Sequence, residues 1–246
     1  MDIDISPDPA ELGRRAGAKA AECLRAVLAG GRRATLVVAT GTSQYATLAA
    51  LILAPDIAWE RVEAFHLDEY VGLSADHPAS FRRYLQERFV ARLPRLAAFH
   101  GVGGDAADPQ VECRRLGALL AGRAVDVGLI GIGENGHLAF NDPPADFTTT
   151  ATYHIVPLDD ACQRQQVGEG WFPSLAAVPK TAITMSVSAI MSFRTIICSV
   201  PDARKAAAVT AAITGPRSPS CPASILREHL GCALYLDRAA AAGLKR

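Results

Sequence analysis

Residues 125–144 read VDVGLIGIGENGHLAFNDPP, and this stretch decides the fold class. Its first six residues form a short, mostly apolar run that is typical of a buried parallel strand. Glycines follow, and they allow backbone turns closed to other residues where such a strand opens into solvent. The histidine, amides and carboxylates around them would then lie at the carboxyl end of a strand, where open α/β sheets bind ligands. We therefore expect this loop to carry part of a functional site.

Outward from this loop, helical and strand-like patterns alternate along the whole chain. Strands are expected at residues 34–39, 61–66, 97–100, 125–130, 152–156, 181–185, 195–200 and 232–236. Helices are expected at residues 9–29, 44–54, 78–91, 108–121, 159–167, 202–213 and 223–228, with a short one between the strands at 181–185 and 195–200. This order predicts an α/β fold with a mostly parallel sheet and helices on both faces. No repeat or long linker interrupts the pattern, so we expect one domain over residues 1–246.

Composition and charge exclude several classes of protein. The 246 residues carry 25 basic and 25 acidic side chains, so no net charge favours a nucleic acid or a membrane as partner. No apolar run reaches the roughly 20 residues of a membrane helix, and the acidic N-terminus does not resemble a signal peptide. The six cysteines show no zinc-type spacing. We therefore expect a cytoplasmic protein with free thiols and no metal.

The segment Thr40-Gly41-Thr42-Ser43 joins an expected strand to an expected helix. Backbone N–H groups at a helix start, with hydroxyls beside them, form an anion site. The alternative is a plain helix cap, which needs only one such hydroxyl. Lys205 follows another expected strand and would bring a cation to the same edge of the sheet. The segment matches neither nucleotide-binding glycine motif, so no nucleotide cofactor is expected.

Two further segments supply groups that move protons. Asp68 and Glu69 directly follow an apolar strand, so a carboxylate could reach the cleft as a general base, although solvated loop acids are commoner. His137 titrates near neutrality, and its polar neighbours on a glycine loop favour a function over the commoner structural role. With an anion site, these groups suit ring opening of a phosphorylated sugar followed by enolisation at C2. Neither step requires a metal or another cofactor.

The chain resembles the glucosamine-6-phosphate deaminases, within a wider group that includes galactosamine-6-phosphate isomerases and 6-phosphogluconolactonases. The resemblance covers nearly the whole chain, and its segments are TGTS at 40–43, FHLDEYVGL at 65–73, the loop at 131–143, VPK at 178–180, and Lys205. It implies a modified Rossmann-like, three-layer α/β/α sandwich. It also implies the metal-independent conversion of glucosamine 6-phosphate to fructose 6-phosphate and ammonia.

The resemblance implies a role for each matching residue. Asp68 would move the proton at C2, and His137 would open the ring with support from positions 135 and 142. The substrate would be bound by Thr40, Gly41, Thr42, Ser43, Gly136 and Lys205. No cofactor is implied, the sugar phosphate is the expected partner, and the oligomeric state is left open, a homo-oligomer included.

The chain departs from the family pattern at several of these positions. Asn135 replaces an aspartate and Asp142 a glutamate, so one charge beside His137 is lost and the other sits on a shorter side chain. An asparagine there could also favour the wrong histidine tautomer. Thr42 and Gln44 replace a glycine and a proline that are frequent in the family. The segment at 163–172 lacks the family's phosphate-binding arginine, for which Arg164 is the candidate replacement, and no match to the family's allosteric site is present.

Two other functions stay open. A 6-phosphogluconolactonase would carry an Asp-Glu-Arg string and a Gly-His-Thr-Ala-Ser loop, whereas this chain has Tyr70 and Phe140-Asn141 at those places. A weakly catalytic sugar-phosphate sensor is the second alternative, because Asn135 removes a charge from the expected site. Turnover with release of ammonia separates the deaminase from both.

Overall fold

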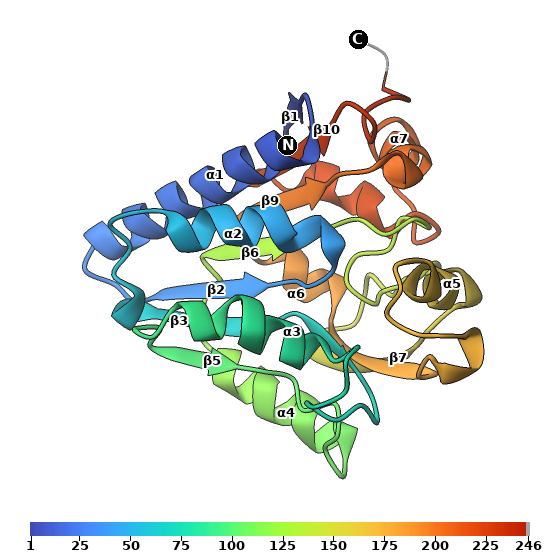
Figure 1. The fold of residues 1–246 in the computed structure, drawn as a ribbon, viewed down its shortest axis with the longest axis horizontal. Helices are drawn as coiled ribbons and strands as arrows, with labels where there is room; N and C mark the ends of the chain where they lie inside the picture. Colours follow the sequence, from blue (N-terminus) through green and yellow to red (C-terminus); the bar gives the residue numbers. More distant parts are fainter. Residues whose placement is uncertain (245–246) are drawn as a thin grey trace.

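The computed structural model describes residues 1–244, and the last two residues of the expected 1–246 domain lie outside the described part. Its centre is a seven-stranded parallel sheet in the order β1-β10-β9-β6-β2-β3-β5 (Figure 1). The strands are β1 (Asp2–Ser6), β2 (Ala34–Val38), β3 (Val62–His66), β5 (Ala98–His100), β6 (Val127–Ile130), β9 (Thr195–Val200) and β10 (Cys232–Asp237). The mostly parallel sheet predicted from the sequence is confirmed.

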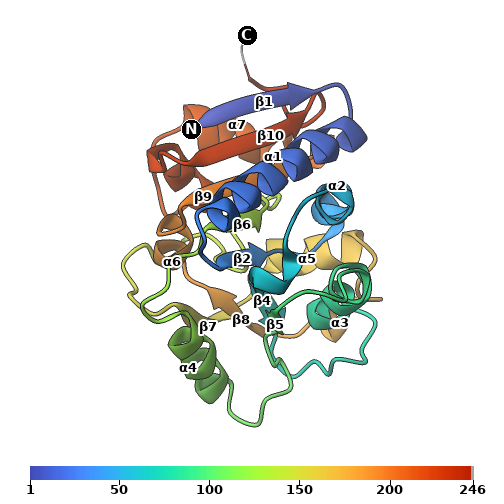
Figure 2. The ribbon, with the colours of Figure 1, turned by 90° about the vertical axis from the view of Figure 1, so that its left-hand side faces the viewer.

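Helices cover both faces of this sheet (Figure 2). One face carries α1 (Pro9–Ala29), α2 (Tyr45–Leu53) and α3 (Phe81–Arg88), and the other carries α4 (Pro109–Leu120), α6 (Val187–Met191) and α7 (Ala206–Thr214). Helix α5 (Asp160–Gly168) lies beyond the carboxyl ends of the strands (Figure 1). Short 3-10 segments span residues 42–44, 59–61, 90–92, 175–177, 203–205 and 222–228. The three-layer α/β/α sandwich is thus confirmed.

The two faces of the sheet bury separate apolar cores, because successive side chains of a strand point in opposite directions. In β2, Leu36 and Val38 pack in the core that contains residues of α1, α2 and α3, whereas Val37 packs in the opposite core. All five residues of β2 are buried. Burial on both faces explains why the central strands read as continuous apolar runs.

Helix α1 fixes the position of α2, whose preceding turn carries the expected anion site. The Asp8 carboxylate caps α1 by accepting the N–H of Glu11 at 2.9 Å, and Pro9 occupies the first turn, where its missing N–H costs nothing. The two helices then pack very closely, because a Cβ added to Gly13 would lie 2.2 Å from the Cβ of Ala46. A larger residue at Gly13 would therefore push α2 away from the sheet.

A second sheet was not predicted from the sequence. Strands β4 (Asp68–Tyr70), β8 (Thr181–Met185) and β7 (Tyr153–Pro157) pair antiparallel in the order β4-β8-β7. Residues 152–156 and 181–185 were predicted as strands, but in the parallel sheet. Periodicity identifies a strand without identifying its partner, and this small sheet is built from segments far apart in the chain.

Several boundaries also differ from those expected. Strands β1 and β4 were missed, the first because acidic residues alternate with its apolar ones and the second because it has only three residues. The helix expected at 78–91 begins only after Ser80, whose hydroxyl caps it by accepting the N–H of Arg83. The helix expected at 202–213 starts with a 3-10 turn, and that expected at 223–228 is entirely 3-10.

The order of the strands creates a crevice between β2 and β6. From β2 the chain adds β3 and β5 on one side, whereas β6, β9 and β10 follow on the other. The segments after β2 and β6 therefore diverge at their carboxyl ends, which is where open α/β sheets bind ligands. Within residues 1–244, the longest and most apolar helices fall short of what crossing a membrane requires.

Candidate active site

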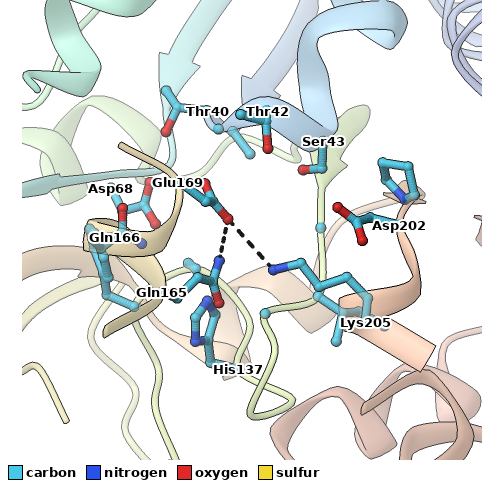
Figure 3. A pocket seen from close by; sticks show the side chains of 18 of the residues that line it. Thr40, Thr42, Ser43, Asp68, His137, Gln165, Gln166, Glu169, Asp202 and Lys205 are labelled. Carbon is cyan, nitrogen blue, oxygen red and sulfur yellow. Dashed lines mark hydrogen bonds and ion pairs between the residues drawn. The ribbon is translucent and has the colours of Figure 1, made fainter. Parts of the chain in front are cut away.

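One cavity of about 270 Å³ opens at this crevice, where segments that follow β2, β3, β6 and β9 meet (Figure 3). Expected site residues that line it are Thr40, Gly41, Thr42, Ser43, Asp68, His137 and Lys205. Asn135, Gly136 and Asp142 do not line the cavity and lie behind its wall. The structure thus brings the expected acid, histidine, lysine and hydroxyl-bearing turn into a single space.

The turn at 40–43 presents backbone amides to the cavity. Gly41 has φ +94°, a conformation that favours glycine, and the 3-10 turn that begins at Thr42 leads directly into α2. The first amides of a helical segment have no partner within it, so they are available to an anion. Gln44, at the position where the family often has proline, is buried and donates to the carbonyl of Ile130 at 3.1 Å. This bond ties the turn to the end of β6.

Asp68 and Glu69 have opposite environments, because neighbouring residues of β4 point to opposite sides. Asp68 faces the cavity. Glu69 instead caps the start of α3, accepting the hydroxyl of Ser80 at 2.8 Å and the N–H of Arg82 at 2.7 Å. Glu69 is therefore structural, and Asp68 is the carboxyl group that a ligand can reach.

Burial is the main influence on the pKa of Asp68. It raises the pKa of this carboxyl to about 8, and the nearby Glu69 adds to the shift. Among the described residues, no side-chain or backbone donor forms a hydrogen bond with the Asp68 carboxylate, so nothing in the protein offsets the desolvation. A carboxyl group with a pKa near neutrality is suited to both accepting and returning a proton.

His137 contacts an acidic side chain behind the cavity wall. Its Nδ1 lies 3.0 Å from Oδ1 of Asp142, although the N–H direction is too far from that oxygen for a regular hydrogen bond. Burial opposes ionisation of Asp142, yet contacts with His137 and Asn135 hold its pKa below the ordinary value. Nε2 of the imidazole faces Gly133, where a Cβ would approach it to 2.2 Å. Glycine at 133 is thus required by the position of this ring.

Asn135 does not contact the imidazole ring. Its amide nitrogen donates to Asp142 at 3.1 Å and to Asp159 at 3.2 Å, and its oxygen accepts the backbone N–H of His137 at 3.1 Å. The tautomer of His137 is therefore influenced by Asp142 and not by the Asn135 amide. The shorter side chain of Asp142 still reaches the ring, because the 135–142 loop folds back on itself.

Lys205 brings a cation to the cavity. Its ammonium group is buried and lies 3.7 Å from a carboxylate oxygen of Glu134 and 3.7 Å from one of Glu169. Burial lowers the pKa of Lys205, and these two acids partly offset the effect. Arg164, the expected replacement for the missing arginine, is exposed and does not line the cavity, whereas Arg204 does.

Sequence reasoning missed the residues that α5 and its end bring to the cavity. Gln165, Gln166 and Glu169 line it, and Gln166 accepts the hydroxyl of Tyr70 at 2.6 Å. Their only sequence signal is the polar spacing 165, 166, 169 on a helix whose position could not be foreseen. Gly136 shapes the neighbouring loop instead, with φ +86° and a carbonyl that accepts the N–H of Ala223.

His137, Asp142 and Cys162 form a cluster that could hold a metal ion. A ring nitrogen, a carboxylate oxygen and the thiol sulfur lie within 4.8 Å of one another, and these are donor types that zinc accepts. The sequence indicates no such cluster because its members come from two separate segments. Cys162 is fully buried, and burial raises the pKa of its thiol well above the ordinary value.

The chain is similar in sequence to known proteins. The sequence model of a family described as glucosamine-6-phosphate isomerases/6-phosphogluconolactonase matches residues 7–234. Glucosamine-6-phosphate deaminase 1 of Bacillus subtilis (strain 168) is 35% identical over 213 residues, 85% of this chain and 86% of that protein. A glucosamine-6-phosphate deaminase of Lactobacillus delbrueckii subsp. bulgaricus is 33% identical over 245 residues, 100% of each chain.

Solved structures show the same fold. A monomeric glucosamine-6-phosphate deaminase superposes with a TM-score of 0.88 at 30% identity and covers 99% of this chain and 100% of its own. A 6-phosphogluconolactonase from Shewanella baltica OS155 has a TM-score of 0.79 at 22% identity and covers 96% of this chain and 97% of its own. The second likeness concerns the fold alone.

Proposed function

Because the chain belongs to the family of glucosamine-6-phosphate isomerases and 6-phosphogluconolactonases, we propose that it is an enzyme that converts glucosamine 6-phosphate and water to fructose 6-phosphate and ammonia. The observation that carries the proposal is the shared cavity. Asp68 and His137 line one space whose other walls carry the turn at 40–43 and the ammonium group of Lys205 (Figure 3). A hexose phosphate needs a base, an acid and an anion site arranged in this way.

Ring opening is assigned to His137. Its Nδ1 faces Asp142, so Nε2 is the nitrogen left to exchange a proton with the sugar. The imidazole takes the proton of the anomeric hydroxyl and delivers a proton to the ring oxygen, which breaks the C1–O5 bond. Asp142 stabilises the imidazolium that forms in between, because its carboxylate is held charged by its contacts.

Enolisation is assigned to Asp68. Its carboxylate removes the proton from C2 of the open aldehyde, and a proton of the substrate's ammonium group passes to the C1 oxygen, which gives an enolamine. The same carboxyl group then returns the proton to C1, which leaves an imine at C2. Water hydrolyses this imine to the ketone and releases ammonia, so the atoms balance without an added reductant or oxidant.

The phosphate group is assigned to the turn at 40–43 and to Lys205. Backbone amides of the turn and the hydroxyl groups of Thr40, Thr42 and Ser43 bind the anion, and Lys205 supplies positive charge. With the phosphate held there, C1 and C2 lie toward Asp68 and His137. Binding energy from the distant phosphate thus positions the reacting carbons.

The raised pKa of Asp68 predicts the pH dependence of catalysis. A base acts only when deprotonated, and burial raises the pKa of Asp68 to about 8, so kcat/KM should rise through a midpoint near pH 8 and level off roughly one pH unit above it. The rise in kcat should lie at lower pH, because the substrate's ammonium group stabilises the Asp68 carboxylate in the complex. Initial rates across this range test both statements. The pH dependence of substrate binding to Asp68→Asn provides the control for titration of the substrate itself, and a flat kcat/KM profile contradicts the assignment.

The function itself is tested with two substrates and two products. Purified protein should release ammonia from glucosamine 6-phosphate and should release little acid from 6-phosphogluconolactone. The opposite preference identifies a lactonase. Tight binding of glucosamine 6-phosphate without ammonia release identifies a sensor and ends the proposal.

We also propose that the enzyme acts as a monomer. Each group assigned above comes from one chain, and the relative that is 30% identical is described as monomeric. Light scattering of the purified protein at the concentration used for assay should give the mass of a single chain.

A further inference from the structure

The acidic side chain of Glu169 lies beside Lys205, in the part of the cavity assigned to the phosphate. Oε1 of Glu169 lies 3.7 Å from Nζ of Lys205 and accepts a hydrogen bond from Nε2 of Gln165 at 2.8 Å (Figure 3). Its other oxygen accepts the indole N–H of Trp171 at 3.2 Å. Only 6% of the Glu169 side chain is exposed. The Glu169 carboxylate is thus buried and contacts one cation and two N–H donors, which are the groups that a bound anion needs.

The charges around this position oppose the simple addition of a phosphate. Lys205 and Arg204 carry two positive charges, whereas Glu134, Glu169 and Asp202 carry three negative ones. Arg204 is already held by Asp202 at 2.9 Å and Glu134 at 3.4 Å. A phosphate dianion placed beside all three carboxylates would meet a net repulsion. One of them must therefore leave when phosphate binds.

Glu169 is the carboxylate placed to leave. It lines the cavity, whereas Glu134 does not. Asp202 also lines the cavity, but it is held by the Arg204 guanidinium at 2.9 Å and by the Arg204 N–H at 3.0 Å. It also follows the last turn of α5 between Gly168 and Gly170, and a Cβ added to either glycine would meet nothing within 4 Å. Gly170 adopts φ +81°, which glycine tolerates without strain. The backbone on both sides of Glu169 thus has the freedom and the space to reorient.

We infer that Glu169 is an internal anion that holds Lys205 in the unliganded enzyme, and that the substrate phosphate binds by exchange with it. The inference rests on the proposed function, because it assigns the same anion site. It makes Glu169 a determinant of specificity. The uncharged hydroxyl of a free hexosamine does not displace a carboxylate from a lysine, whereas a phosphate dianion does. The exchange therefore selects phosphorylated substrates over free hexosamines.

The first test compares Glu169→Gln with Glu134→Gln as a matched control. Both substitutions remove a carboxylate 3.7 Å from Lys205, but only the first removes a competitor from the cavity. Calorimetric titration with inorganic phosphate should show about tenfold or greater tightening for Glu169→Gln and a clearly smaller change for Glu134→Gln. Unchanged or weaker phosphate binding by Glu169→Gln overturns the inference, because Glu169 would then support the anion.

The second test follows the displacement directly. The chain has two tryptophans, so Trp59→Phe leaves Trp171 as the only indole. Inorganic phosphate should change the emission of Trp171 in this variant, because its N–H loses the Glu169 carboxylate. Adding Glu169→Gln should remove most of that change. Phosphate binding without any change in Trp171 emission means that Glu169 stays in place, which also overturns the inference.

The two proposals fail separately. The wild-type protein could release ammonia from glucosamine 6-phosphate while Glu169→Gln fails to tighten phosphate binding. That result rules out the exchange and leaves the enzyme assignment intact. Wild-type protein that neither binds phosphate nor releases ammonia removes both.

Discussion

Asp68→Asn is expected to lower kcat by about 10³-fold or more while glucosamine 6-phosphate still binds. An amide has nearly the size of a carboxyl group but does not accept the C2 proton. The Asp68 carboxylate also makes no hydrogen bond with the described part of the protein, so the substitution breaks no contact. Ammonia release measures the first effect, and calorimetric titration with substrate measures the second.

The same variant has a stability signature that distinguishes it from a misfolded protein. Burial raises the pKa of Asp68 from 3.8 in the reference state to about 8 in the folded one. Folding therefore retains a proton that the unfolded chain releases, and this residue's contribution to stability falls as pH rises from about 4 to 8. Asp68→Asn removes this dependence, so at pH 8 it should be more stable than wild type by an amount on the order of a few kcal/mol.

Denaturant unfolding at two pH values measures this difference. An inactive variant that is also less stable at pH 8 would show that Asp68 has a structural role and not the role of a base. A variant with near-normal turnover would move the proton transfer to another residue; Glu169 and Asp202 are the other acids that line the cavity.

The central sheet and its helices could be predicted because burial on both faces leaves a direct trace in the sequence. Strand β9 was expected at its observed bounds, and α1 was expected at both of its ends. Strand β1 left no such trace, because it is an edge strand whose Ile3 and Ile5 remain 42% and 47% exposed. The small sheet was invisible for a different reason, since pairing between distant short strands depends on the tertiary fold.

The candidate site was predictable only where a residue follows a parallel strand. Those positions reach the same edge of the sheet whatever the details of packing, which is why the turn at 40–43, Asp68, His137 and Lys205 meet in one cavity. The sequence did not show that Asp68 faces the cavity while Glu69 caps α3, because this difference depends on the position of β4. Arg204 and Glu169 required the position of α5 and the 3-10 turn at 203–205, which no local pattern reports.

The contacts of Asn135 oppose a return to the family's aspartate at this position. On the family pattern, restoring aspartate at 135 should keep or raise activity. In the structure the Asn135 amide donates to both Asp142 and Asp159, so an aspartate there would add a third carboxylate and remove two hydrogen bonds. Like charges at such distances raise one another's pKa and oppose folding. We therefore expect Asn135→Asp to be less active and less stable than wild type.

Asp142→Asn should lower kcat by about 10² to 10⁴-fold, because the imidazolium formed during ring opening loses the carboxylate that lies 3.0 Å from its Nδ1. The loss should be confined to that step. An acyclic analogue of the amino-sugar phosphate, which needs no ring opening, should restore most of the rate to Asp142→Asn and none to Asp68→Asn. If the analogue rescues neither variant, the two residues act in the same step, and the division of proton transfers between His137 and Asp68 is wrong. If Asp142→Asn retains full ring-opening activity, His137 does not depend on the Asp142 carboxylate, and the role assigned to that contact is wrong.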